Sequence, residues 1–406
     1  MTEASLSLTE YGPWMAARLA PAVGQALAAS RIVEARPDVD GPGDSTRWQV
    51  RALNYVGAVR IGGVELRITP KLPIRRLFFL LGYAADPRGV QRPIGGEVQV
   101  DQERDLLPAV AHAFERQAER AVRPGLLQGY RHTEESTTVV RGRIREHDQL
   151  RRRFGLTLPI EIAYDEYTPD IAENQLLHAA TLRLLRLPGV HLDVRRRLLA
   201  LRARLADVRA LTTGQPLPRW RPSRLNDRYH PALRLAELIL NSASVEHHEG
   251  TVRIDGFLFD MNKVFEDFVC VALREALREC GGRTELQAGG IHLDEAETVR
   301  IKPDFVWYDD SDRPLAVVDA KYKAERPEGF PDADLYQLLA YCTALRLPAG
   351  HLIYAKGSAP HAAHHIRNTG IRIHQNALDL DQPPDALLAD ISRIAAALGA
   401  ISDKAS

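Results

Sequence analysis

The stretch 301-IKPDFVWYDDSDRPLAVVDAKYK-323 contains two apolar segments separated by the polar run DDSDRP. A run of this composition lets the chain double back, so the two segments are predicted to pair as neighbouring strands. The second segment begins with four apolar residues, Leu315 to Val318, as expected for a central strand covered on both faces. It then continues into Asp319 and Lys321, whose charges are costly to bury without partners. These charges are therefore predicted to lie at the rim of the sheet or in a cleft.

The residues at the ends of the two strands predict a metal-dependent hydrolytic site. Side chains alternate along a strand, so Asp319 and Lys321 share one face and Ala320 lies on the other. Asp304 begins the neighbouring strand and can come beside Asp319 after the turn. A divalent cation relieves the repulsion between two carboxylates, and their hard oxygens favour Mg²⁺ or Mn²⁺ over Zn²⁺. The lysine could orient or help deprotonate a water and stabilise charge on a phosphate. The predicted chemistry is phosphodiester hydrolysis, and the alternative is a structural ion-pair cluster.

Three further residues are candidates for the same site. Glu266 lies between apolar residues in a helix that precedes the strands, and it is either a solvated helix charge or a third acid. Gln337 and Tyr341 stand one helical turn apart and share a helix face, so both could reach one cleft. Tyr341 is equally compatible with a core position.

The pattern around these residues predicts an α/β protein of three parts. Residues 251–406 contain a helix, the strand pair, a second helix and a further strand, which is typical of an α/β sandwich around a mixed sheet. Residues 1–100 contain an alternating hairpin with Gly62-Gly63 at its turn and then a helix, which predicts a small β-rich α/β domain. Residues 101–250 are mainly helical by their apolar periodicity, with short strands and loops between the helices.

The composition limits the class of protein. A hydrophobic content of 45% and a charged content of 26% over 406 residues are typical of an ordinary globular protein with two or three domains. The net charge of zero gives no bulk attraction to nucleic acid. Three scattered cysteines do not form a disulfide framework or a four-cysteine metal site. We find neither an apolar run long enough to span a membrane nor an export signal, so we expect a cytoplasmic protein without a membrane partner.

Several motifs resemble known nucleases. Pro303-Asp304, Asp319-Ala320-Lys321 and Glu266 resemble the PD-(D/E)xK restriction-endonuclease-like superfamily, and Gln337 with Tyr341 resembles the QxxxY motif of its RecB-like branch. More specifically, four segments in order resemble the McrC family, the nuclease subunits of McrBC-like modification-dependent (type IV) restriction systems. These segments are NYVGAVRIGGVELRITPKL, VVRGRI, YDEYTPDIAENQLL and MNKVFEDFV. The resemblance covers the chain from about Trp48 to Tyr354.

The resemblance implies a function and a partner. Members of this family act with McrB, a GTP-hydrolysing AAA+ ring that recognises modified DNA and translocates. The McrC-like subunit plugs the ring through its N-terminal and stalk region and cuts double-stranded DNA. By motif match, Asp304 and Asp319 are metal ligands with the carbonyl of Ala320, Lys321 is the catalytic lysine, and Glu266 is an accessory acid. The helices of residues 101–250 would form the stalk.

Two other functions stay open from the sequence. One is a non-catalytic adaptor that activates a ring NTPase and keeps the nuclease fold for DNA contact, although such a protein is expected to have lost the lysine or an aspartate. The other is a stand-alone RecB-like exonuclease, which would leave the first 250 residues without a role.

Overall fold

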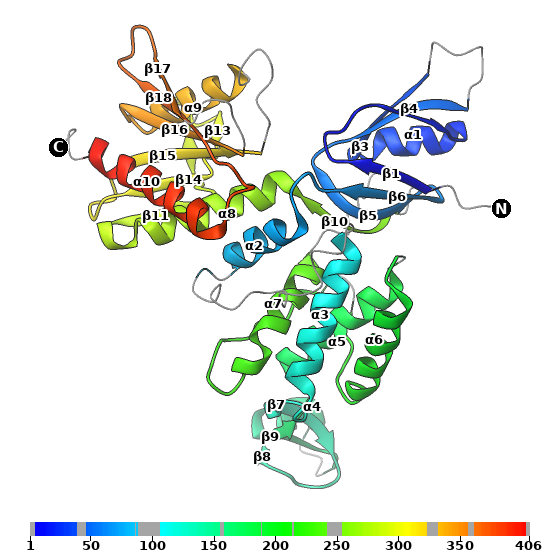
Figure 1. The fold of residues 1–406 in the computed structure, drawn as a ribbon. Helices are drawn as coiled ribbons and strands as arrows, with labels where there is room; N and C mark the ends of the chain where they lie inside the picture. The colour runs from blue at the N-terminus through cyan, green and yellow to red at the C-terminus, as the bar shows by residue number, and fades with distance from the viewer. Residues whose placement is uncertain are drawn as a thin grey trace. The chain divides into compact units, whose positions relative to one another are not determined.

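The computed structural model describes residues 5–38, 46–85, 87, 106–154, 158–187, 189–212, 215–241, 254–322, 332–355 and 361–402. The chain is mixed α/β with several separate sheets, which confirms the predicted class (Figure 1). Its contacts group it into two compact units, one formed by Met1–Leu106 with Val245–Ser406 and one by Leu107–Ser244. The finer division into three domains stays a prediction.

The N-terminal part of the first unit is built on two small sheets. A four-stranded sheet has the order β1-β6-β5-β10, and a three-stranded sheet has the order β2-β4-β3. Gly62 and Gly63 join β5 to β6 with φ values of 55° and 86°, a left-handed conformation that glycine adopts without strain, and the predicted hairpin is confirmed. The elements of this part are β1 (Ser5–Thr9), β2 (Met15–Arg18), α1 (Pro21–Ala29), β3 (Val33–Pro37), β4 (Arg47–Ala52), β5 (Tyr55–Ile61), β6 (Val64–Thr69), α2 (Ile74–Ala85) and β10 (Ile254–Asp260).

Strand β10 connects the two ends of the chain within this unit. It pairs antiparallel with β5 and leads directly into α8 (Met261–Ala276). Asp260 caps this helix by accepting hydrogen bonds from the main-chain N–H groups of Asn262 and Lys263 at 2.9 and 3.4 Å. The segment MNKVFEDFVCVALREALREC (261–280) is amphipathic along its length and predicts one long helix, but the helix ends at Ala276 and a short 3-10 turn, Arg278–Cys280, follows it.

A six-stranded mixed sheet forms the C-terminal part of the first unit. Its order is β11-β14-β15-β16-β18-β17, with β15, β16 and β18 parallel and the other neighbours antiparallel. Helix α9 packs on β15, β16 and β18, and α8 and α10 pack on each other and on β15 (Figure 1). The elements are β11 (Arg283–Leu286), β12 (Ile291–His292), β13 (Arg300–Ile301), β14 (Phe305–Tyr308), β15 (Pro314–Lys321), α9 (Asp332–Ala344), β16 (Ala349–Tyr354), β17 (His361–His365), β18 (Arg372–Ala377) and α10 (Pro384–Ser402).

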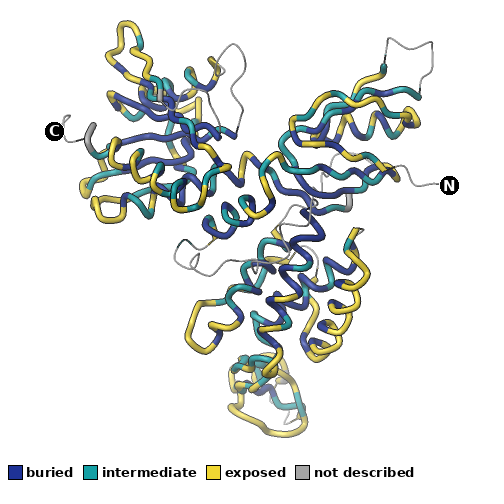
Figure 2. The backbone as a smooth tube through the Cα atoms, in the orientation of Figure 1, coloured by how far each residue is buried: buried dark blue, intermediate teal, exposed yellow. Residues whose placement is uncertain are grey.

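The second unit combines helices with a three-stranded sheet of order β7-β9-β8. Helix α5 packs against α6 and α7, and α4 packs on β9. Figure 2 shows that helix α3 is largely buried, whereas the chain around β7 and β8 is mostly exposed. The elements are α3 (Leu106–Val122), β7 (Gly129–Thr137), β8 (Arg143–Ile144), α4 (Glu146–Arg153), β9 (Ile160–Thr168), α5 (Ala172–Arg186), α6 (Leu192–Arg204), η2 (Asp227–Tyr229) and α7 (His230–Asn241).

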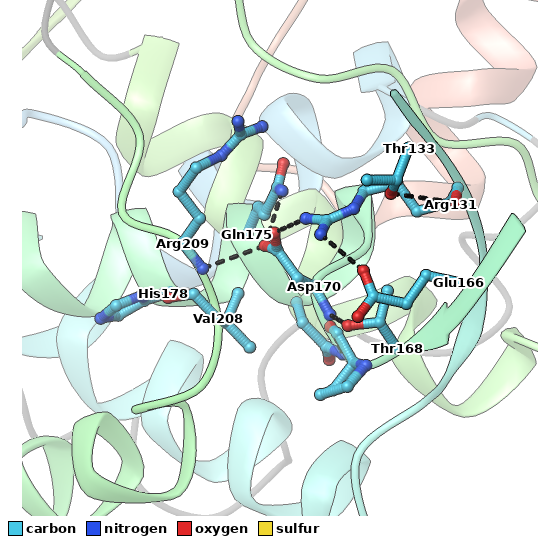
Figure 3. A network of polar contacts seen from close by, with 11 residues as sticks. Arg131, Thr133, Glu166, Thr168, Asp170, Gln175, His178, Val208 and Arg209 are labelled. Atoms are coloured by element: carbon cyan, nitrogen blue, oxygen red, sulfur yellow. Dashed lines mark hydrogen bonds and ion pairs between the residues drawn. The ribbon is translucent and has the colours of Figure 1, made fainter. Parts of the chain in front are cut away.

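A polar network around Asp170 joins the sheet of the second unit to its helices (Figure 3). The carboxylate of Asp170 accepts hydrogen bonds from Gln175 Nε2 at 2.8 Å and from the main-chain N–H of Arg209 at 3.0 Å. It also forms an ion pair with Arg131, whose guanidinium reaches Glu166 at 2.9 Å. Burial alone would raise the pKa of Asp170, but these hydrogen bonds and the arginine charges outweigh it and lower the pKa. The YDEYTPDIAENQLL segment therefore includes residues that hold the second unit together.

Across the parts of the chain that the structure describes, no helix is both long and apolar enough to cross a membrane.

Candidate active site

Asp319 and Lys321 form a buried ion pair at the carboxyl end of β15. Lys321 Nζ lies 2.7 Å from Asp319 Oδ2, and the two side chains are 19% and 1% exposed. They share the face that packs on α9, because Val317 of the same alternating set belongs to the core formed with that helix. The other carboxylate oxygen, Asp319 Oδ1, is buried without a hydrogen-bond partner among the described residues.

Asp304 comes beside this pair through the β14–β15 pairing. Phe305 lies opposite Val318 in this antiparallel register, so Asp304 adjoins the position of Asp319. Asp304 Oδ2 accepts a hydrogen bond from the main-chain N–H of Ala320 at 2.9 Å. The strand pairing predicted from the sequence is confirmed, and it brings the two carboxyl groups together at one end of the sheet.

Glu266 joins the cluster through Gln287, a residue that the sequence analysis missed. Gln287 Nε2 donates a hydrogen bond to Asp304 Oδ1 at 3.1 Å and a second to Glu266 Oε1. The main chain of Gln287 is held as well, since its N–H donates to the carbonyl of Asp304 at 2.8 Å. Gln287 directly follows β11, and its position depends on the pairing of β11 with β14. The only feature of the sequence that could have indicated Gln287 is an amide side chain directly after a strand.

Mutual repulsion and burial make this cluster electrostatically strained. Burial first, and then the charge of Asp304, raise the pKa of Asp319 to about 7. The same two causes, with Asp267 as a third, raise the pKa of Glu266 to about 7. Burial disfavours the charged form of Lys321, but the neighbouring carboxylates outweigh it and raise the pKa of this lysine. Lys321 is therefore an ammonium at neutral pH. Its single positive charge is too little to neutralise three carboxyl groups, those of Asp304, Asp319 and Glu266.

Gln337 and Tyr341 lie on the same face of α9, as predicted, and contact each other. Gln337 Nε2 donates a hydrogen bond to Tyr341 Oη at 2.6 Å, and that hydroxyl donates to the main-chain carbonyl of Lys302 at 3.2 Å. The side chain of Tyr341 belongs to the core cluster under α9. Burial and then the charge of Asp319 raise its pKa, which places the hydroxyl within electrostatic range of the site. Tyr341 thus fills a core position and also holds the segment that leads into Asp304.

The donor atoms at this site suit a hard divalent cation. Asp304 and Asp319 offer carboxylate oxygens, and one of these, Asp319 Oδ1, is buried without a hydrogen-bond partner among the described residues. Ala320, which directly follows Asp319, offers a main-chain carbonyl. Within the described ranges, no three His, Cys, Asp or Glu side chains are arranged as a metal-binding group. A cation here would therefore need a main-chain oxygen or water to complete its ligands, as Mg²⁺ commonly does.

Comparisons with known proteins place the whole site inside one family match. A family model described as "McrBC 5-methylcytosine restriction system component" matches residues 50–355, a range that contains all seven predicted site residues. No curated protein matches the chain.

Two solved structures from Thermococcus gammatolerans match the chain. One belongs to a refined half-complex from a tetradecameric assembly of McrB AAA+ hexamers with bound McrC. It is 17% identical with a TM-score of 0.54, over 96% of this chain and 99% of that one. The other belongs to the McrBC complex solved by cryo-electron microscopy, and it is 19% identical with a TM-score of 0.40, over 68% of this chain and 88% of that one.

Proposed function

The chain belongs to the family of McrBC 5-methylcytosine restriction system components, and on this premise we propose that it is the Mg²⁺-dependent DNA endonuclease subunit of a McrBC-like restriction complex. The observation that carries the proposal is the convergence of Asp304, Asp319 and Lys321 at one end of a mixed sheet, with a buried carboxylate oxygen left unpartnered. In this proposal the six-stranded sheet with α8, α9 and α10 is a restriction-endonuclease-like sandwich of the PD-(D/E)xK superfamily.

Each residue of the site has a role in phosphodiester hydrolysis. Asp304, Asp319 and the carbonyl of Ala320 would hold Mg²⁺ or Mn²⁺, which when bound supplies a Lewis acid for the phosphate and lowers the pKa of water. Lys321 is fixed by Asp319 and presents its ammonium to negative charge that develops on the phosphate. Its remaining N–H donors can orient a water for attack.

Glu266 is the accessory acid in this scheme. Its pKa of about 7 lets it hold or release a proton near neutral pH, and Gln287 keeps its carboxyl next to Asp304. Gln337 and Tyr341 act one step further out, since their hydrogen bonds fix the carbonyl of Lys302 just before Asp304. These residues position the metal-binding carboxylate without touching the reacting atoms.

The proposed partner is a McrB-like AAA+ GTPase ring. The support is the family match and the similarity in fold to a chain of the T. gammatolerans assembly of McrB AAA+ hexamers with bound McrC. We propose that the ring selects DNA containing modified cytosine, that the unit Leu107–Ser244 is the stalk toward it, and that this chain stimulates its GTPase.

Reconstitution tests this function. The purified chain is mixed with its cognate McrB-like GTPase, GTP and plasmids with or without 5-methylcytosine, in Mg²⁺ or in EDTA. Cleavage is expected only with methylated DNA, partner, GTP and Mg²⁺ together. Stimulated GTP hydrolysis without cleavage would support the adaptor instead. Degradation of linearised plasmid from its ends by the chain alone would support the stand-alone exonuclease.

A further inference from the structure

A buried hydrogen bond joins the N-terminal sheet to the strand that carries Lys321. Tyr322 directly follows Lys321, and its hydroxyl donates to Glu10 Oε1 at 2.6 Å across a sequence separation of 312 residues. Glu10 is 0% exposed and Tyr322 is 8% exposed, so neither group can exchange this partner for bulk water.

Glu10 is rigidly held on the N-terminal side of this bond. Its main-chain N–H donates to the carbonyl of Thr69 at 3.0 Å, and the residue forms a parallel bridge with Ala52. Its carboxylate also accepts from the main-chain N–H of Lys71 at 3.2 Å. The second oxygen, Oε2, is buried without a hydrogen-bond partner in the described part of the chain. Keeping a carboxyl group here is costly, so its contact with Tyr322 calls for an explanation beyond local stability.

A neighbouring segment of the N-terminal sheets holds the helix that carries Glu266. Asn54 Nδ2 donates to Asp260 Oδ1 at 2.5 Å, and the carbonyl of Asn54 accepts from the N–H of Met261 at 2.9 Å. Asn54 lies two residues after Ala52, the bridge partner of Glu10. Two adjoining segments of the N-terminal sheets therefore make these contacts: Asn54 contacts the start of α8, and Glu10 contacts the residue after the end of β15.

The packing of Tyr322 connects these two contacts. Its ring lies against that of Phe265, with 6.0 Å between ring centroids, and Phe265 precedes Glu266 on α8. Lys321 is the last residue of β15, where its carbonyl accepts from Ala355 N–H at 3.2 Å. The hydroxyl of Tyr322 adds a second anchor directly after the lysine.

We propose that Tyr322 is a positioning residue, which transmits the placement of the N-terminal sheets to Lys321 through its hydrogen bond to Glu10. The inference rests on the proposed nuclease function and deepens it, because it assigns to this chain a path between its N-terminal sheets and the reacting centre. A displacement of a catalytic group by about 1 Å costs roughly a hundredfold in rate, so an anchor of this kind has a measurable effect.

Tyr322→Phe is the decisive variant, because it keeps the ring against Phe265 and removes only the donor. Single-turnover cleavage of methylated DNA by the assembled complex is measured over a range of DNA concentrations, together with GTP hydrolysis. We expect the cleavage rate at saturating DNA to fall about 10- to 100-fold, with the half-saturating DNA concentration and the GTPase rate unchanged. Glu10→Gln keeps an acceptor oxygen and should lose less activity than Glu10→Leu.

A matched control separates positioning from stability. Tyr229 is buried as well, and its hydroxyl accepts a hydrogen bond from the N–H of Leu127 at 2.9 Å in the other unit. Tyr229→Phe should lose a comparable amount of stability and leave the cleavage rate unaltered. A Tyr322→Phe complex that cuts at the wild-type rate, or that loses cleavage and GTPase together, overturns the inference alone. Absence of cleavage by the wild-type complex in the same assay overturns the proposed function and this inference with it.

Discussion

Replacing Asp319 with Asn is expected to stabilise the chain when no divalent metal is present. Asp319 is 1% exposed and has the carboxylate of Asp304 as a neighbour, with only Lys321 as a compensating charge. A residue selected for folding stability alone would not be placed in these surroundings. The metal-binding role in the proposed function accounts for it, since groups that serve a reaction are often kept at the expense of stability.

The magnitude follows from the pKa of this carboxyl group. Its pKa is about 7 in the folded chain against an ordinary value of 3.8. The raised pKa means that Asp319 favours folding in its protonated form. This contribution is complete below pH 3.8 and is lost as the pH rises through about 7. At about 1.36 kcal/mol per pKa unit, the difference between the two pKa values lowers the free energy of unfolding by on the order of 4 kcal/mol at pH 8. An Asn side chain resembles the protonated carboxyl group but removes the ion pair with Lys321. We therefore expect the free energy of unfolding to rise by about 1–4 kcal/mol.

The assay is urea unfolding at pH 8 in EDTA, followed by hydrogen exchange of peptides from β14 and β15. Asp165→Asn is the matched control, because that side chain is 67% exposed and its replacement should change the free energy of unfolding by less than about 0.5 kcal/mol. Added Mg²⁺ should stabilise the wild-type chain and leave Asp319→Asn unchanged, since binding to the folded state alone raises its stability.

The opposite sign would refute this reasoning. If Asp319→Asn is less stable than the wild-type chain in EDTA, the carboxylate is held favourably by Lys321 and its surroundings. The group would then be the structural ion-pair cluster that the sequence analysis left open.

Two further predictions concern the polar network of the second unit and the amide of the site. Asp170→Asn should destabilise the second unit by about 1–3 kcal/mol in a denaturation experiment, because charge-assisted hydrogen bonds are lost. Because the pKa of Asp170 is lowered in the folded chain, its contribution to stability is complete above pH 3.8 and is lost as the pH falls further. The free energies of unfolding of wild type and variant should therefore converge in acid. A difference between them that stays constant down to pH 2 would contradict this prediction. Gln287→Leu should slow DNA cleavage about 10- to 100-fold without weakening complex formation, because Glu266 loses its link to Asp304. An unchanged cleavage rate would show that this link has no part in the reaction.

The geometry of the site was predictable where it depends on local periodicity. One tight turn and the two-residue period of a strand are enough to bring Asp304 beside Asp319 and to put Lys321 on the same face. The hairpin at Gly62-Gly63 was predictable for the same reason, since its turn chemistry and alternation are contained in one short segment.

Features that depend on distant pairing were not predictable in this way. The segment that forms β10 was expected to belong to the C-terminal part, yet it pairs with β5 of the hairpin near the N-terminus. Gln287 likewise reaches the site only through the pairing of β11 with β14. Helix α4 was missed for a different reason, because its sequence EHDQLRRR has a single apolar residue, Leu150, and that residue is 67% exposed. Without an apolar face there is no helical period to detect.

The most direct test of the proposed active site is single-turnover cleavage of methylated DNA by complexes that contain Lys321→Ala. The proposal predicts a loss of at least about a hundredfold in the cleavage rate, with complex assembly and GTP hydrolysis intact, since the ammonium that stabilises charge on the phosphate is gone. Arg393→Ala serves as the control for loss of a surface cation, because this arginine is 78% exposed and should not affect cleavage. Cleavage by the Lys321→Ala complex at the wild-type rate would contradict the assignment of Asp304, Asp319 and Lys321 as the nuclease centre.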